Sequence, residues 1–112
     1  MDNGNCIISE KISANRERRI AHLENLMVVV FDFKNGPMKD PDPFHSHPHE
    51  QITYVAKGEL LFFKGSDEYH LSEGDLMIIP PGIPHCIQTL SWSVRLVDSF
   101  TPLRKDFLQI NK

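Results

Sequence analysis

The segment Pro43-Phe44-His45-Ser46-His47-Pro48-His49-Glu50-Gln51 (PFHSHPHEQ) places three of the six histidines of the chain within five residues. In an extended chain, residues two apart project from the same face. His45 and His47 therefore form a two-pronged clamp, and Gln51 shares their face. The local geometry nominates these three side chains as metal ligands, because imidazole and amide groups both offer lone pairs to a cation.

Other interpretations of the cluster remain open at this point. Glu50 has the opposite parity and would replace Gln51 only through a strand bulge. His49 has the favourable parity, but Pro48 before it can bend the chain. Gln51 can instead be a structural amide that hydrogen-bonds inside the protein, and the whole cluster can be a polar loop that binds no metal.

A second segment, Gly74 to His85 (GDLMIIPPGIPH), reads as a strand that ends in a proline-glycine turn. The turn delivers His85 to the start of the next strand. A lone histidine in that place is usually structural. Together with the first cluster, however, His85 completes a set of four candidate metal ligands.

The rest of the chain predicts strands separated by turn signals such as Lys57-Gly58 and Lys64-Gly65. Many short strands at close spacing predict an all-β, antiparallel sandwich or barrel. A weak helical pattern covers Glu10–Arg19, and its basic stretch Arg16–Arg19 predicts a solvated surface. The predicted strands are Leu26–Phe33, Gln51–Ala56, Glu59–Phe63, Glu68–Leu71, Asp75–Ile79, His85–Leu90 and Ser93–Asp98.

Composition and charge exclude several classes of function. A chain of 112 residues fits one domain, and a net charge of −3 gives no electrostatic case for nucleic acid or an anionic membrane. The first residues are too polar for a signal peptide, and no apolar run spans a bilayer. The two cysteines form no disulfide framework, and Cys86 is expected to be a buried, inert thiol. We therefore expect a cytoplasmic protein.

The two histidine segments resemble the paired motifs of the cupin family. The first motif is matched by His45-x-His47, three residues, Gln51, six residues and Gly58, and the second by Gly74, five residues, Pro80, one residue, Gly82, two residues and His85. The resemblance implies one cupin domain over residues 1–112, with motif 1 at about 43–58 and motif 2 at about 74–89. It also implies the cupin double-stranded β-helix, a jelly-roll barrel with a metal in its bowl. Two positions depart from the motifs: Gln51 replaces a glutamate and Thr89 replaces an asparagine.

A glutamine in the glutamate position changes the charge of the site. With neutral imidazoles at His45, His47 and His85 and the neutral amide of Gln51, a bound divalent transition metal keeps its full +2 charge. Such a cation in a partly dry cavity attracts an anion and polarises oxygen groups. The ligand set does not distinguish Zn, Ni, Fe, Mn and Cu. The expected ligand is a small anionic sugar or another carboxylate.

The chain after the last predicted strand carries Asp98-x-Phe100-x-Pro102-x-Arg104. Asp98 and Phe100 share a parity, and Arg104 can fold back over the mouth after Pro102. An acid, an aromatic ring and a guanidinium next to a cation suit a sugar acid. The alternative is an exposed tail in which Arg104 forms a salt bridge with Asp106 or Asp98.

This tail and the HSHPHEQ segment are similar to those of the KdgF group of cupins, which acts in pectin and alginate breakdown. The resemblance implies an enzyme that converts a 4,5-unsaturated uronate to its linear keto form. It assigns metal binding to His45, His47, Gln51 and His85, proton transfer to Asp98, and substrate contacts to Phe100 and Arg104. The alternatives are a non-catalytic sugar-binding or sensor cupin, and a metal-dependent dioxygenase or isomerase. We also expect a homodimer, formed through an exposed first strand near Cys6–Ser9.

Overall fold

The computed structural model describes residues 7–108, and this part of the chain forms nine strands and one short helix. The predicted all-β class is therefore confirmed. The strands are β1 (Ile7–Ser13), β2 (Arg16–His22), β3 (Met27–Phe33), β4 (Glu50–Lys57), β5 (Leu60–Lys64), β6 (Asp67–Leu71), β7 (Leu76–Ile79), β8 (His85–Thr89) and β9 (Val94–Thr101), followed by α1 (Lys105–Leu108).

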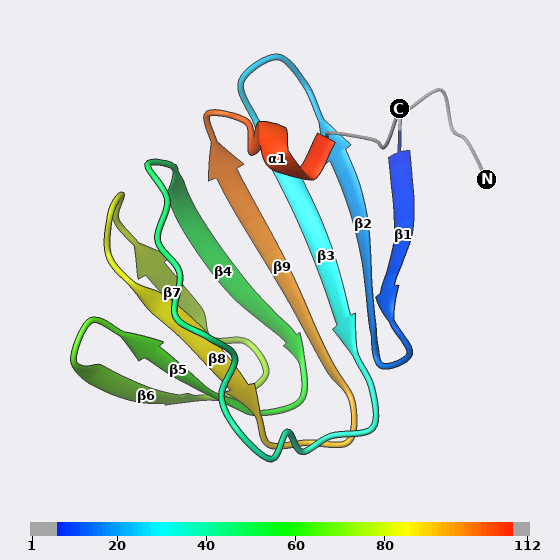
Figure 1. Cartoon of the computed structure of the whole chain (residues 1–112), viewed down its shortest axis with the longest axis vertical. Helices are drawn as coiled ribbons and strands as arrows, with labels where there is room; N and C mark the ends of the chain where they lie inside the picture. Colours follow the sequence, from blue (N-terminus) through cyan, green and yellow to red (C-terminus); the bar gives the residue numbers. More distant parts are fainter. Residues whose placement is uncertain (1–6, 109–112) are drawn as a thin grey trace.

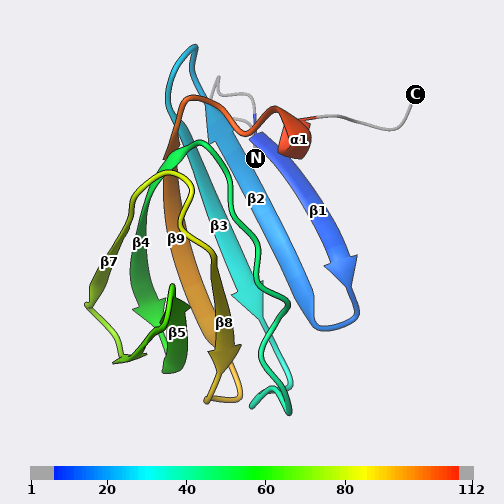
Figure 2. The same ribbon diagram turned by 60° about the vertical axis from the view of Figure 1, so that its left-hand side comes forward.

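Two antiparallel sheets face each other (Figures 1 and 2). The larger sheet has the order β1-β2-β3-β9-β4-β7, and the smaller sheet has the order β6-β5-β8. Strand β9, the last in sequence, lies between β3 and β4 near the centre of the larger sheet. This position pairs the C-terminal part of the chain directly with β4, the strand that carries Gln51.

The long segment between β3 and β4 runs beside β8 (Figure 2). Its backbone N–H groups at Met38 and Asp42 donate to the carbonyls of Thr89 (3.1 Å) and Ile87 (2.9 Å). The segment therefore extends the smaller sheet although it is a proline-rich loop in sequence. Because its backbone is paired, its side chains have defined positions, as those of a strand do.

The N-terminal segment corrects two expectations. Residues of the predicted helix Glu10–Arg19 form the hairpin β1–β2 instead, and their exposure alternates along β2 with the two-residue period of a strand. The expected solvated surface at Arg16–Arg19 is wrong for two of its arginines. Arg16 and Arg18 are partly buried, and their guanidinium carbons lie 4.7 Å and 4.3 Å from the ring centres of Phe33 and Phe107.

Seven further strands match the predicted ones with small shifts at their ends. The largest shift is in β9, which continues past Asp98 to Thr101 because it pairs on both sides: Phe100 lies opposite Met27 of β3 and Gln51 of β4.

Cys6, in the expected first strand, lies outside the described residues. Strand β1 does form an edge of the larger sheet, and the homodimer stays a prediction. The described residues contain no helix long and apolar enough to cross a membrane.

The core lies between the sheets and beneath the C-terminal segment. One cluster joins buried side chains of both sheets, and a second cluster packs under α1. The first contains Phe33, Val55, Leu60, Phe62, Leu71, Met77, Ile79, Ile87, Val94 and Leu96. The second contains Ile20, Met27, Val29 and Phe100, with Leu103 and Phe107 packed against it.

We predict that Gly58→Ala destabilises the protein much more than Gly65→Ala. Gly58 lies in the turn that leads from β4 in the larger sheet to β5 in the smaller sheet, and Gly65 lies in the turn of the β5–β6 hairpin. Both have positive φ, 85° and 60°. A Cβ at position 58 would lie 2.4 Å from the carbonyl oxygen of Ser93, whereas a Cβ at position 65 would meet nothing within 4 Å. Strain from φ costs about 1–2 kcal/mol at either site, and the clash adds about 1–3 kcal/mol at position 58 alone. Denaturant unfolding measures the difference, and equal losses would contradict it.

Candidate metal centre

Backbone pairing brings the two histidine segments together. The N–H of His45 donates to the carbonyl of His85 (3.0 Å), and the N–H of His85 donates to the carbonyl of His45 (2.9 Å). The N–H of Gly82, in the proline-glycine turn, donates to the carbonyl of His47 (2.8 Å). As a result the ring centres lie 4.2 Å apart for His45 and His85 and 4.9 Å apart for His47 and His85.

The three imidazoles are arranged as metal ligands. One ring nitrogen from each lies within 4.8 Å of the others. His85 donates its Nδ1–H to the carbonyl of Ile83 (2.8 Å), and the Nδ1 of His47 lies 3.2 Å from the carbonyl of His49. Such contacts fix the ring orientation and leave Nε2 free for a cation. The Nε2 of His85 is buried and has no hydrogen-bond partner among the described residues, as expected of a nitrogen that serves as a metal ligand.

The environment keeps these imidazoles neutral. Burial lowers the pKa of His45, His47 and His85, and the positive charge of Arg104 lowers each pKa further. His47 and His85 are 8% and 3% exposed, whereas His45 lies open at the rim. A neutral imidazole has the lone pair that a metal needs, so the set is prepared for a cation at neutral pH.

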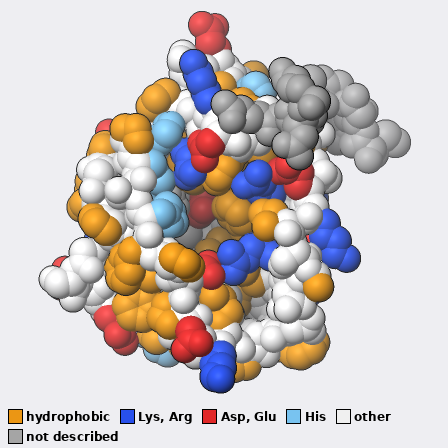
Figure 3. Space-filling model, viewed as in Figure 1, with side chains coloured by type: hydrophobic (Ala, Val, Ile, Leu, Met, Phe, Trp, Pro, Cys, Tyr) orange, Lys and Arg blue, Asp and Glu red, His pale blue; other side chains and the backbone are white. Residues whose placement is uncertain are grey.

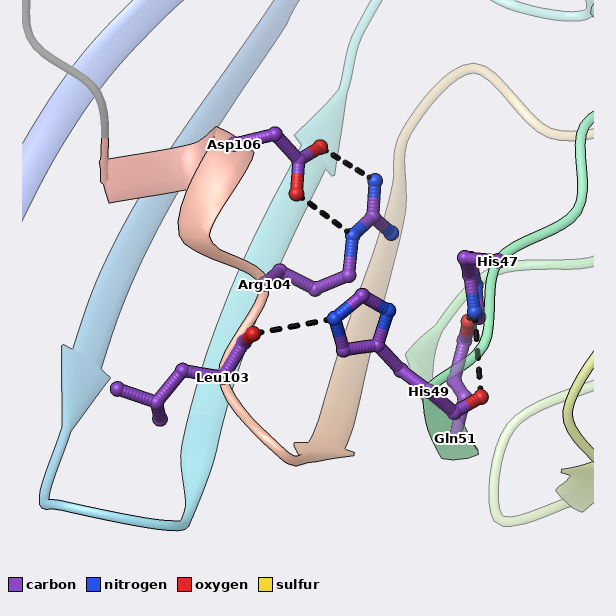
Figure 4. Close-up of polar contacts among 6 residues, drawn as sticks. All are labelled: His47, His49, Gln51, Leu103, Arg104 and Asp106. Carbon is purple, nitrogen blue, oxygen red and sulfur yellow. Dashed lines mark hydrogen bonds and ion pairs between the residues drawn. The ribbon is translucent and has the colours of Figure 1, made fainter.

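Gln51 supplies an oxygen next to the imidazoles. Its Oε1 lies 3.0 Å from the Nε2 of His47 (Figure 4). Neighbouring ligands of one ion with bonds of about 2.1 Å lie about 3 Å apart at right angles, so this spacing fits a shared cation. The structure places Gln51 inside, at 6% exposure, and Glu50 on the opposite, exposed face.

A buried carboxyl lies behind the amide. Gln51 donates its Nε2–H to Oγ1 of Thr53 (2.9 Å), and Thr53 donates its hydroxyl to Oδ1 of Asp98 (2.7 Å). Burial raises the pKa of Asp98 to about 7, against smaller lowering effects of Thr53 and Arg104. A carboxyl with this pKa exists in both protonation states at neutral pH, which suits a group that gives and takes a proton.

The C-terminal segment, residues 103–107, forms one wall of the site, beside His49 and Gln51 (Figure 4). The guanidinium of Arg104 makes two hydrogen bonds to Asp106, 3.1 Å and 2.7 Å long, and stacks on Phe107 and Phe100 at 4.1 Å and 5.3 Å from the ring centres. His49 donates its Nε2–H to the carbonyl of Leu103 (3.0 Å). The loop that carries His45, His47 and His49 is therefore joined directly to the C-terminal segment. Arg104 forms the salt bridge to Asp106 and also lines the cavity.

A cavity of about 390 Å³ connects all these parts. In Figure 3 its mouth has histidine side chains on one side and basic side chains on the other. Six of the seven predicted site residues line it, and His47 is buried against Phe100 at its edge. Sequence reasoning missed three further groups: Arg16 and Arg18 of β2, Phe107 of α1, and Thr53 of β4. The alternation in β2 was the signal that points to the two arginines.

Residues 30–98 match the model of the cupin domain family. The chain therefore belongs to the cupin family, and the predicted jelly-roll barrel is confirmed.

The resemblance to the KdgF group is confirmed by particular relatives. The pectin degradation protein KdgF of Dickeya dadantii is 31% identical over 94 residues, which cover 83% of each chain. The structure of KdgF from Halomonas sp. matches with a TM-score of 0.79 and 27% identity, over 89% of this chain and 90% of that one. An RmlC-like cupin from Shewanella frigidimarina matches with a TM-score of 0.79 and 29% identity, over 89% and 87%.

We predict that a divalent transition metal stabilises the metal-free protein through these ligands. Zn²⁺ at 100 times its dissociation constant adds about 2.7 kcal/mol to the free energy of unfolding. His45→Ala removes an exposed ligand with little effect on the metal-free fold, and it should weaken binding by more than about 100-fold, because losing even a group that only orients a ligand costs about 10–100-fold. Thermal unfolding with and without Zn²⁺ measures both effects. His70→Ala, at an exposed position on β6, is the control, and an equal Zn²⁺ response in His45→Ala would refute the assignment.

We predict that Asp98→Asn stabilises the metal-free protein at alkaline pH. The pKa of Asp98 rises on folding from 3.8 to about 7, so the native state binds more protons and the free energy of unfolding falls as pH rises through this interval. The asparagine variant lacks this penalty. Its advantage should be small near pH 4 and reach about 4 kcal/mol at pH 8, because the pKa rises by about three units and each unit corresponds to 1.36 kcal/mol. Denaturant unfolding in chelator across this range measures it, and a pH-independent difference would exclude the elevated pKa.

Proposed function

We propose that the protein converts a 4,5-unsaturated uronate to its linear keto form, as a metal-dependent cupin of pectin degradation. The observation that supports this most is the near-neutral pKa of the buried Asp98 carboxyl, in the same cavity as Arg104 and three of the four neutral groups proposed as metal ligands. The likeness to the pectin degradation protein KdgF supports the substrate class. The ligand groups are His45, His47, His85 and Gln51.

The substrate fits the cavity in charge and size. A volume of about 390 Å³ is within the range of small-molecule sites, about 300–1,000 Å³. The bound divalent metal would supply Lewis-acid stabilisation of negative charge on a substrate oxygen. Arg104 presents a guanidinium to the same space, and guanidinium groups bind carboxylates through two parallel hydrogen bonds. Phe100 lies beneath Arg104 and gives the cavity an apolar floor.

The reaction is an isomerisation in which one proton changes place. The hydroxyl on the anomeric carbon loses its proton, the bond from that carbon to the ring oxygen breaks, and an aldehyde forms. The ring oxygen becomes the ketone oxygen, and carbon 4 gains a proton. The ionised carboxylate of Asp98 takes the proton that the hydroxyl releases and, in its acid form, delivers a proton to carbon 4. Thr53 holds one oxygen of Asp98, so the other is the one available for this transfer.

We predict that Asp98→Asn keeps its metal and loses most of its turnover. One positioned proton carrier contributes about 10²–10⁴-fold, so kcat should fall by about that factor while metal content stays at the wild-type value. The assay follows the ultraviolet absorbance of the conjugated enol ether with unsaturated galacturonate and glucuronate, alongside elemental analysis. The matched control is Ser99→Ala, which changes the neighbouring residue on the other face of β9.

Two results would count against the proposal. Full activity in Asp98→Asn would show that Asp98 does not carry the proton. A metal-loaded wild-type protein that binds the unsaturated uronate tightly and never consumes it would indicate a sugar-binding cupin instead.

A further inference from the structure

Thr53 connects the candidate metal centre to the buried carboxyl. It lies directly opposite Asp98 in the β4–β9 ladder and two residues from Gln51 on the same face of β4. Its side chain is almost fully buried, at 1% exposure, and Gln51 and Asp98 are 6% and 7% exposed. Its only hydrogen-bond partners in the described structure are the amide of Gln51 (2.9 Å) and Oδ1 of Asp98 (2.7 Å).

The chemistry of these groups fixes the direction of both hydrogen bonds. A hydroxyl has one proton to donate, and an ionised carboxylate only accepts. When Asp98 is ionised, which a nearby divalent cation favours, Thr53 must therefore give its proton to Asp98 and can only accept from Gln51. The group of Gln51 that donates is its NH₂, so the carbonyl oxygen of the amide points the other way, toward His47 and the other imidazoles. This assignment follows from donors and acceptors and does not depend on telling N from O in the amide.

We propose that Thr53 is a positioning residue that makes Gln51 a metal ligand by forcing its amide oxygen, and not its NH₂, toward the imidazoles. An amide nitrogen has no lone pair for a metal, so a flipped amide would leave the cation one ligand short. This inference rests on the metal site proposed above and does not depend on the uronate as substrate.

The single proton of the Thr53 hydroxyl also makes a neutral amide at position 51 compatible with the carboxylate of Asp98. A glutamate at position 51 would be a second acceptor beside Thr53, and one hydroxyl proton cannot serve two ionised carboxylates. A carboxylate also has two equivalent oxygens and needs no partner to choose which one faces the metal. Thr53 therefore matters to metal binding when residue 51 is glutamine, and matters little when it is glutamate.

A double-mutant cycle on metal affinity tests the proposal without any substrate. Thr53→Val keeps the shape of the side chain and removes the hydroxyl. In the protein with Gln51 it should weaken Zn²⁺ binding by about 10–100-fold, the usual cost of losing a group that orients a ligand. In the Gln51→Glu background it should weaken Zn²⁺ binding by less than about threefold, because either carboxylate oxygen can face the metal. Titration calorimetry with Zn²⁺ alone measures the four affinities.

Thr53→Ser retains the hydroxyl. It should bind Zn²⁺ within about threefold of wild type, because serine can make the same hydrogen bonds to Gln51 and Asp98. If Thr53→Val does not fold, which circular dichroism of the metal-free protein shows, Thr53→Ala replaces it in both backgrounds. Equal losses in the wild-type and Gln51→Glu backgrounds would show that Thr53 only supports the fold, and no loss in the wild-type background would show that it orients nothing. Either result overturns the proposal, whereas absence of uronate turnover affects only the proposed reaction.

Discussion

The antiparallel backbone pair between His45 and His85 is the contact on which the site depends. Its two hydrogen bonds join a proline-rich loop to the first residue of β8, and the bonds from Met38 and Asp42 extend the pairing along the same strand. Side chains on an unpaired loop would move relative to the barrel. Here the loop is held like a strand, so the imidazoles are in place before a cation arrives, and less ordering entropy is lost when it binds.

Much of this arrangement follows from the two-residue period of a strand. The inward positions of Gln51, Asp98 and Phe100 are predictable because β4 and β9 pair without irregularity between them, and the one shift in register lies beyond, between Val55 and Lys57. The same rule applied to β2 turns Arg16 and Arg18 inward. Two charged side chains on one face nevertheless look like a solvent-facing surface in the sequence. In this barrel the two arginines face a partly polar cavity instead of solvent. Their inward position can be seen only from their partners in the folded protein, Phe33 and Phe107.

The partners of those arginines come from the far end of the chain. Phe107 lies between the guanidinium groups of Arg18 and Arg104, at 4.3 Å and 4.1 Å from its ring centre. Arg18 is also bonded to Glu10 of β1 at 2.6 Å. The N-terminal hairpin and the C-terminal helix therefore close the same wall of the cavity. No local pattern predicts such a contact, because each half is an ordinary surface segment until the barrel brings the two together.

The balance of charge in the cavity connects the neutral side chain at position 51 to the proposed anionic substrate. Each arginine of the wall already has an acidic partner: Arg16 pairs with Asp42, Arg18 with Glu10 and Arg104 with Asp106. Asp98 has no ion-pair partner among the described residues, and a nearby divalent cation would favour its ionised form. A +2 ion and one carboxylate leave a net charge of +1, and one substrate carboxylate makes the site neutral. With glutamate at position 51 the site would be neutral before any substrate entered, and the attraction for a sugar acid would be lost.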